Sequence, residues 1–267
     1  MAGPWLDGAR LNNLLLTVLI AAIFVAAALR ARRKKVPVRR LPAMDSIDDA
    51  VHKAASSGRP VVYVPGVGQA SAMATAASMS ILGQVAAKCA ACGAKLLVPH
   101  YDPVVQGICV GIVKKVYAER GVSEQEAEKA NFFVSQEQFS YVAAVDGLIS
   151  RAKPGACFYM GQFMAESLLL TEVGAASGAM QVAGTDSESQ LPFFFASCDN
   201  ALLGEEFYAT GAYLSEDAIL RGSLRAQDLV KILAIALVGV TLAVIAISFW
   251  LGRPDLAHKA LELLRVS

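Results

Sequence analysis

Two long apolar segments without a charged residue constrain the fold of this chain more than any other feature. One runs from Leu14 to Leu29, and the other covers the twenty residues from Ile232 to Leu251. A helix needs about 20 apolar residues to cross roughly 30 Å of hydrocarbon. The second segment has that length, and the first reaches it if it begins at Leu11. We therefore expect transmembrane helices at residues 11–29 and 229–251, with one domain between them at residues 46–228.

The charges beside the first segment predict the orientation of both helices. Residues 30–40 contain seven basic side chains and no acidic one, whereas residues 1–10 contain one Arg and one Asp. Because basic residues are retained on the cytoplasmic side, we expect a two-pass protein of the inner (cytoplasmic) membrane, with its domain in the cytoplasm and both termini outside. A cleaved signal peptide is the competing interpretation, but its basic residues would precede the apolar segment.

The charged residues are distributed unevenly along the chain, and this distribution indicates which partners to expect. Leu41–Asp228 contains 12 Lys and Arg against 20 Asp and Glu, a net charge of −8. A nucleic-acid partner is not expected, because binding phosphates needs a basic face. Arg30–Arg40, in the basic linker at residues 30–45, is expected to meet anionic lipid headgroups or to act only as a topology signal.

Two patterns near the C-terminus suggest further contacts. One face of the second span carries only small residues, which allows close packing on the first span (Ala21, Ala22, Ala26) or on another copy: Ala236, Gly239, Ala243 and Ala246. Residues 252–267 have the spacing of an amphipathic helix, expected as an outer tail at the membrane interface. We therefore expect a homo-oligomer or a subunit of a membrane complex.

Short, continuously apolar segments alternate with helical ones through residues 46–228. The expected strands are Val61–Val64, Lys95–Val98, Asn131–Val134, Ala156–Tyr159, Met180–Ala183 and Pro192–Ala196. Apolar strands between helices are typical of a parallel sheet covered on both faces. The predicted fold is α/β, a doubly wound, mostly parallel sheet of five or six strands inserted between the two membrane helices. Gly121–Lys129 is expected to be a solvated loop and Ala201–Leu214 a helix.

Ligands of such sheets bind beyond the carboxyl ends of the strands. The candidate ligand-binding residues at these ends are Gly66, Gly68, Gln69, Ser71, Gln162 and Thr185. Gly66–Ser71 approximates the G-x-G-x-x-G pattern, in which glycines let backbone N–H groups approach a phosphate at a helix N-terminus. A plain tight turn is the favoured interpretation, and an anion or carboxylate site and a dinucleotide site remain open. The glycine pattern does not identify a cofactor, and no group of residues in the sequence has the spacing of a metal site.

Three side chains at the same predicted ends are candidates for acid–base chemistry: His100, Glu166 and Asp199. A histidine beside a carboxylate can act as a general base. However, Asp102 is better explained as the N-cap of a helix that begins with Pro103. Glu166 falls in a first helical turn, where a carboxylate is stable without any catalytic task.

Other chemistry-bearing residues have structural explanations. The chain has five cysteines, and Cys89 and Cys92 lie at the end of an expected helix, where the dipole disfavours a thiolate. Core packing therefore explains this pair better than redox chemistry. The sequence contains no nucleophile elbow, Walker P-loop or HExxH motif, and no second histidine suited to a triad.

A series of short motifs follows the candidate site. It includes Gly184-Thr185, Gln190-Leu-Pro-Phe-Phe194 and Gly204-Glu-Glu206, ahead of the second apolar segment. Over most of Pro60–Leu251 the chain resembles a family of uncharacterised prokaryotic membrane-anchored proteins, catalogued only as a domain of unknown function. The resemblance implies the architecture and carries no activity, ligand or catalytic residue.

These observations lead to two expectations about function. The first is a membrane-tethered α/β domain that acts as a scaffold, complex subunit or small-ligand sensor and self-associates. The alternative is an enzyme acting on a small polar or anionic substrate near the inner leaflet, with His100, Glu166 and Asp199 as its acid–base groups. A pocket that brings these three side chains within hydrogen-bond reach would favour the enzyme.

Overall fold

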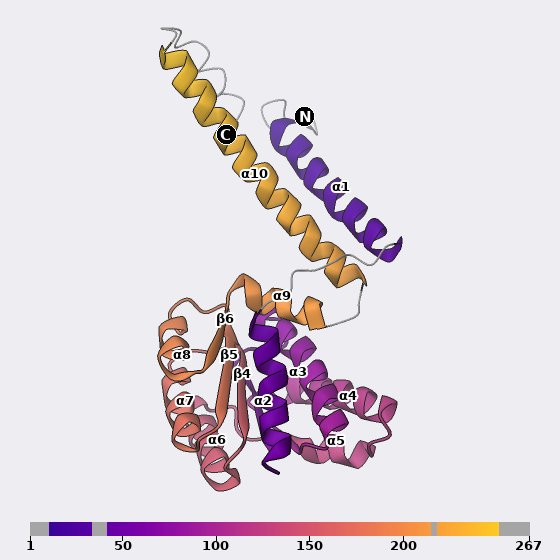
Figure 1. Ribbon diagram of the computed structural model, residues 1–267, viewed down its shortest axis with the longest axis vertical. Helices are drawn as coiled ribbons and strands as arrows, with labels where there is room; N and C mark the ends of the chain where they lie inside the picture. The colour runs from indigo at the N-terminus through magenta and orange to yellow at the C-terminus, as the bar shows by residue number, and fades with distance from the viewer. Residues whose placement is uncertain (1–10, 34–41, 215–217, 251–267) are drawn as a thin grey trace, which may run out of the picture. The chain divides into compact units, whose positions relative to one another are not determined.

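A computed structural model describes residues 11–33, 42–214 and 218–250 (Figure 1). The chain divides into two compact units, an α/β domain at Arg39–Ser215 and a unit formed by the flanking segments. The expected outer N-terminus (1–10), most of the basic linker (34–41) and the amphipathic tail (252–267) lie outside the described residues.

The flanking unit contains two helices that lie side by side, α1 (Leu11–Arg33) and α10 (Ala218–Trp250) (Figure 1). Among the described helices, one stretch is long and apolar enough to cross a membrane, Arg225–Trp250 in α10. The apolar part of α1, Leu16–Ala27, is shorter than a span requires. The segment at 11–29 is therefore helical as expected, but it is not confirmed as a second transmembrane helix.

The small-residue face of α10 is not the face that α1 covers. Ala236, Gly239, Ala243 and Ala246 are all exposed. A Cβ atom placed on Gly239 would meet nothing within 4 Å. The expected packing of this face on the first span is therefore not made at Gly239, and the face is open.

In the domain, the described residues form a six-stranded, fully parallel sheet with the strand order β3-β2-β1-β4-β5-β6. Its strands are β1 (Val61–Gly66), β2 (Leu96–His100), β3 (Asn131–Phe133), β4 (Ala156–Gln162), β5 (Met180–Thr185) and β6 (Asn200–Leu203). Every residue of β1 is buried, because helices cover both faces of the sheet. The predicted α/β class and parallel sheet are confirmed.

The helices form one layer on each side of the sheet. One layer comprises α2 (Pro42–Ser56), α3 (Met73–Cys92), α4 (Pro103–Glu119), α5 (Glu124–Ala130) and α9 (Glu205–Leu214). The other comprises α6 (Gln138–Ala152), α7 (Ser167–Ala176) and α8 (Leu191–Ser197). Figure 1 shows α6, α7 and α8 across the strands from α2, α3, α4 and α5. Each layer buries its own hydrophobic core against the sheet.

The sixth strand was predicted at the wrong segment. Pro192–Ala196 belongs to helix α8, where Pro192 occupies the first turn and its missing N–H breaks no helical hydrogen bond. The strand is Asn200–Leu203, which pairs with β5 from Val182 onward. Gly204 (φ +39°) then ends the strand, so the helix expected from Ala201 begins only at Glu205.

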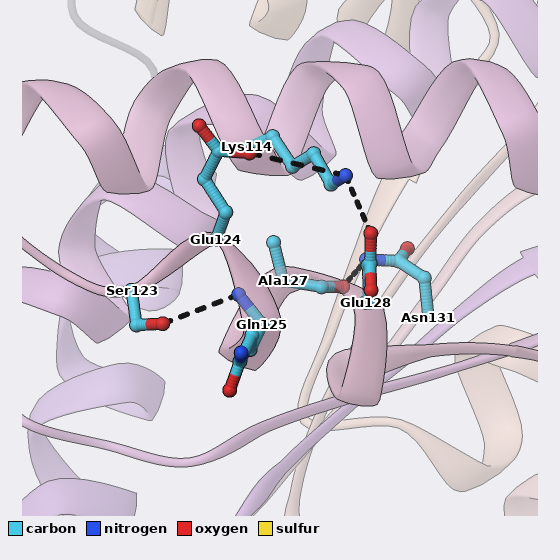
Figure 2. Close-up of polar contacts among 7 residues, drawn as sticks. All are labelled: Lys114, Ser123, Glu124, Gln125, Ala127, Glu128 and Asn131. Carbon is cyan, nitrogen blue, oxygen red and sulfur yellow. Dashed lines mark hydrogen bonds and ion pairs between the residues drawn. The ribbon is translucent and has the colours of Figure 1, made fainter.

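The segment expected to be a solvated loop, Gly121–Lys129, instead contains helix α5 (Figure 2). The Ser123 hydroxyl accepts a hydrogen bond from the Gln125 N–H at 3.2 Å and so caps the helix. The Lys114 ammonium on α4 pairs with Glu128 at 2.5 Å and with Glu124 at 4.0 Å. The charges that suggested a loop therefore lie on the exposed side of a short helix, which buries Ala127 and Ala130 in the core.

Candidate functional site

The polar residues after the strands meet where the strand order reverses. β1 and β4 are parallel neighbours at the centre of the sheet. The chain leaves β1 toward α3 in one layer and leaves β4 toward α7 in the other layer. In open parallel sheets this arrangement leaves a crevice for ligands between the two departing loops. We call this region, residues 66–75 and 161–166, the switch-point site.

Two glycines allow the ends of β1 and β4 to approach very closely. Gly66 has φ +80°, and a Cβ atom there would lie 2.3 Å from the carbonyl oxygen of Gln162. Gly161 has φ +142°, and its Cβ atom would lie 2.2 Å from the carbonyl oxygen of Pro65. The pairing register shifts at this point, between Val64 and Gly66. Only glycine fits these two positions, because other residues rarely adopt such φ values and would clash with the backbone.

Gly68 lies over a buried hydroxyl group. A Cβ atom on Gly68 would be 2.4 Å from Oγ1 of Thr75 and 3.0 Å from Oε1 of Gln162. Thr75 is fully buried, and its hydroxyl has no hydrogen-bond partner among the described residues. Leaving a buried hydroxyl unpaired costs about 1–3 kcal/mol. The Gly68 loop thus covers a polar group whose hydrogen-bonding capacity is unused.

Helix α3 begins directly after this loop and has no side-chain cap in the described part of the chain. Its N-cap residue is Ala72, which cannot accept a hydrogen bond with its side chain. Its first turn contains no acidic residue. The exposed side chains of Gln69 and Ser71 precede it. The free N–H groups and the positive end of the helix dipole therefore face the switch-point site without compensation.

Of the other predicted ligand-binding residues, Gln162 lies at the centre of the site and Thr185 does not. The Gln162 side chain is half-buried beside Gly68. Thr185 ends β5, on the far side of β4 from β1. Its buried hydroxyl accepts a hydrogen bond from the Ser187 N–H at 3.1 Å. Thr185 therefore orders its own loop.

Glu166 lies at the edge of the site with both carboxylate oxygens engaged. Its side chain accepts hydrogen bonds from the Gln138 amide at 2.5 Å and from the Met164 N–H at 3.0 Å. Glu166 is only 2% exposed. Nearby, burial raises the pKa of the Tyr141 hydroxyl, and the negative charge of Glu166 raises it further. The Glu166 carboxylate thus joins α6 to the loop after β4.

His100 is fully buried at the end of β2 and is held by Asn131. The Asn131 amide donates to the carbonyl of Ala127 at 2.8 Å (Figure 2), so its Oδ1 accepts from Nε2–H of His100 at 3.0 Å. Burial lowers the pKa of His100 to about 4. His100 is therefore neutral at physiological pH, with a structural hydrogen bond.

Asp102, beside His100 in the sequence, caps helix α4. Its carboxylate accepts hydrogen bonds from the N–H groups of Val104 at 2.6 Å and Val105 at 3.1 Å. The helix-capping interpretation of this residue is confirmed. Asp102 is therefore committed to the start of α4.

Asp199 does not lie where the sequence placed it. Because the sixth strand begins at Asn200, Asp199 precedes this strand and lies at the amino edge of the sheet. Its carboxylate accepts a hydrogen bond from the Gln181 N–H at 2.7 Å, near the start of β5. His100 and Glu166 follow strands at the opposite edge, so the three candidates do not form one acid–base cluster.

The described residues also contain no group of three or more His, Cys, Asp or Glu side chains that could hold a metal ion. Apart from the Glu166 carboxylate at its edge, which is engaged by Gln138 and Met164, the switch-point site consists of neutral polar groups and a helix N-terminus. Such an arrangement can bind a polar or anionic group.

Three contributors to the site were missed in the sequence: Thr75, Gly161 and Gln138. The role of Gly161 could have been predicted, because a glycine inside an apolar strand often indicates a bulge or a close backbone approach. Thr75 and Gln138 gave no signal, since their roles depend on segments distant in the sequence.

A separate surface groove of about 580 Å³ lies at the amino edge of the sheet, around the segment that enters β2. Its lining includes Cys89, Lys129 and Glu126. Lys129 pairs with Glu126 at 3.0 Å. Burial raises the pKa of the Cys89 thiol to about 12, so Cys89 supplies no thiolate at neutral pH, as expected for core packing.

Comparison with known proteins identifies a family without a known function. The family model named domain of unknown function DUF6754 matches residues 1–253 of this chain. No curated protein and no solved structure matches this chain. Since the match covers nearly the whole sequence, the chain belongs to the DUF6754 family.

Proposed function

We propose that this protein is a membrane-tethered α/β domain that senses a small polar or anionic ligand at the switch-point site and self-associates, as a scaffold or as a subunit of a membrane complex. One observation carries the ligand-binding part of the proposal. Unused donors, the first turn of α3 and the Thr75 hydroxyl, lie where the chain leaves β1 and β4 toward opposite layers of helices. Sheets of this topology bind ligands at that place.

The membrane part of the proposal rests on sequence and on one helix. Arg225–Trp250 has the length and composition of a span, and the Leu14–Leu29 segment with its basic flank fits a second span. We propose a two-pass protein of the inner membrane with the domain in the cytoplasm. The basic residues Arg30–Arg40 would then meet anionic headgroups of the inner leaflet.

The enzymatic alternative has less support. Asp199 bonds to the backbone at one edge of the sheet, while Glu166 and His100 lie at the other edge with structural partners. A catalytic acid–base pair needs both groups within reach of one substrate. The contacts of these three side chains favour sensing or scaffolding over catalysis.

Purification of the full chain in mild detergent tests the proposal. Native mass spectrometry should show an assembly of more than one chain that retains a small molecule, which is then identified after release. A single chain that carries no small molecule would contradict it. Chemical conversion of the retained molecule on incubation would instead support the enzyme.

A further inference from the structure

We propose that the switch-point site binds a phosphoryl group, which rests on the N-terminus of α3 and accepts a hydrogen bond from the Thr75 hydroxyl. This inference rests on the proposed function, because it names the chemical class of the sensed ligand. The phosphoryl group can belong to a soluble phosphate compound or to a lipid headgroup, and the two share the chemistry that the site recognises.

The first argument is that, among the described residues, no side chain caps the first turn of α3, whereas side chains cap α4 and α6. Helix α7, which begins after β4, also has no side-chain cap in this part of the chain, but its N-cap residue Glu166 carries a carboxylate, which would repel an anion. The carboxylate of Asp102 caps α4, and the carboxylate of Glu137 caps α6 through the N–H groups of Phe139 and Ser140. The α3 N-cap, Ala72, offers no such group. With 20 residues, α3 presents a full helix dipole to an anion at this end.

The second argument is the state of the Thr75 hydroxyl. Buried helical threonines usually donate to the carbonyl four residues earlier. In this protein Thr171 does so at 2.9 Å and Thr210 at 2.7 Å. Thr75 is the third residue of α3, so the residue four positions earlier, Ser71, precedes the helix. Thr75 is fully buried, and its hydroxyl makes no hydrogen bond within the described residues. The Thr75 hydroxyl, in the third position of α3, is therefore available to donate a hydrogen bond to an anion at the N-terminus of this helix.

The third argument is the backbone above that hydroxyl. Gly68 covers Oγ1 of Thr75 without a side chain of its own. A ligand oxygen reaches the hydroxyl when the Gly68 peptide turns outward, and glycine allows this rotation because it lacks a Cβ atom. The Gln162 side chain lies beside the same point with its Oε1 toward Gly68, and rotation of the amide would present its N–H donors to a ligand.

Together these groups suit a phosphoryl group better than a carboxylate. A phosphoryl group offers three terminal oxygens, which match the first-turn amides, the Thr75 hydroxyl and the Gln162 amide. No Lys or Arg lies between Pro65 and Met73, so neutral donors do the binding. Met73 and Met164, which are 75% and 52% exposed, flank the site. The remainder of the ligand is therefore expected to be apolar or aromatic.

Ligand titrations of the full chain in detergent test this inference. The probes are inorganic pyrophosphate, AMP and a short-chain phosphatidic acid, with malonate as a carboxylate control. The change in melting temperature and the apparent affinity are measured for the wild type, Thr75→Val, Thr75→Ser and Thr171→Val. A preference for AMP or for phosphatidic acid identifies a soluble or a lipid source.

We expect at least one phosphoryl probe to bind saturably and malonate to bind more weakly. Thr75→Val should weaken binding about tenfold, since it removes a hydrogen bond to a charged group, while Thr75→Ser and Thr171→Val stay near the wild type. The ligand-free Thr75→Val protein should melt no lower than the wild type, because valine has the same shape without an unpaired hydroxyl. This result separates lost binding from lost folding.

Equal binding by the wild type and Thr75→Val would overturn the inference. A retained molecule without a phosphoryl group would also overturn it and would leave the proposed function intact. If no probe binds and the purified protein carries no small molecule, both the inference and the proposed function fail.

Discussion

At the residue scale, His100 should make the stability of the domain depend on pH. Burial lowers its pKa to about 4, whereas an unfolded histidine has a pKa near 6.5. The folded state therefore favours neutral His100. Its contribution to the free energy of unfolding is fully present above pH 6.5 and is lost as the pH falls toward 4. This loss should reach about 3 kcal/mol at pH 4. Thermal unfolding followed by tyrosine circular dichroism, from pH 7 to pH 4, measures it.

The His100→Gln variant serves as the control for that measurement, because it removes the titrating group. Asp146, whose pKa burial raises to about 6, acts in the opposite direction and is present in both proteins. The difference between the two pH profiles therefore isolates His100. Parallel profiles from pH 7 to pH 4 would contradict a buried, neutral His100.

Gly68 is expected to tolerate no side chain. Gly68→Ala places a methyl group 2.4 Å from Oγ1 of Thr75 and 2.9 Å from Cβ of Gln162. This overpacking should destabilise the domain by about 1–3 kcal/mol. Gly107→Ala is the matched control, since Gly107 lies inside α4 with nothing within 4 Å of its Cβ position. It should stabilise by up to about 1 kcal/mol. Equal melting temperatures for the two variants would refute the close contact at Gly68.

The sequence revealed part of the site at this scale. Gly66 and Gly68 could be identified because a buried strand, a Pro-Gly turn and a helix follow one another locally. The importance of Thr75 could not be predicted, because it depends on the approach of Gln162, which lies 87 positions further along the chain. No local sequence pattern indicates that a single hydroxyl group will be buried.

At the element scale, the errors in β6 and α5 have a common cause. Both segments are short, so tertiary contacts outweigh local composition. The apolar run around Pro192 looks like a strand, yet Phe194 packs into the core from a helix. The charged run around Ser123 looks like a loop, although Ser123 and Glu126 have the spacing of a capping box. That spacing was the available signal for α5.

The open face of α10 leads to a prediction about assembly. Gly239→Leu adds a bulky side chain to the exposed small-residue face, which should prevent close approach of a second copy in lipid. Val238→Leu is the control, because Val238 is already large and exposed. Native mass spectrometry and light scattering in detergent should show a smaller assembly for Gly239→Leu only. An unchanged mass for both variants would rule out this face as the contact.

At the scale of the whole molecule, the proposed topology predicts a labelling pattern. A thiol reagent that cannot cross membranes should label a cysteine placed at Ala2 or Ser267 from outside intact cells. It should not label one placed at Ser123, an exposed residue of the domain. Wild-type protein gives the background, since its five cysteines all lie in the domain. Labelling at Ser123 from outside would overturn both the orientation and the cytoplasmic location.

The architecture of the domain was predictable from sequence, but its connectivity was not. Continuous apolar strands such as Val61–Val64 require cover on both faces, which indicates a parallel sheet. The order β3-β2-β1-β4-β5-β6 arises because the chain returns after β3 to the other side of β1 and adds β4 there. No local pattern encodes that choice, and it is this choice that sends the chain to opposite layers after β1 and after β4.

The central claim, that the switch-point site holds the ligand, is tested most directly by hydrogen exchange. The full chain in lipid nanodiscs is compared with and without its retained small molecule, once that molecule has been identified and added back. We predict slower exchange at the amides of residues 66–75 and 162–166, and unchanged exchange at residues 93–97 beside the groove at the amino edge. Protection at residues 93–97 with none at residues 66–75 would contradict the account.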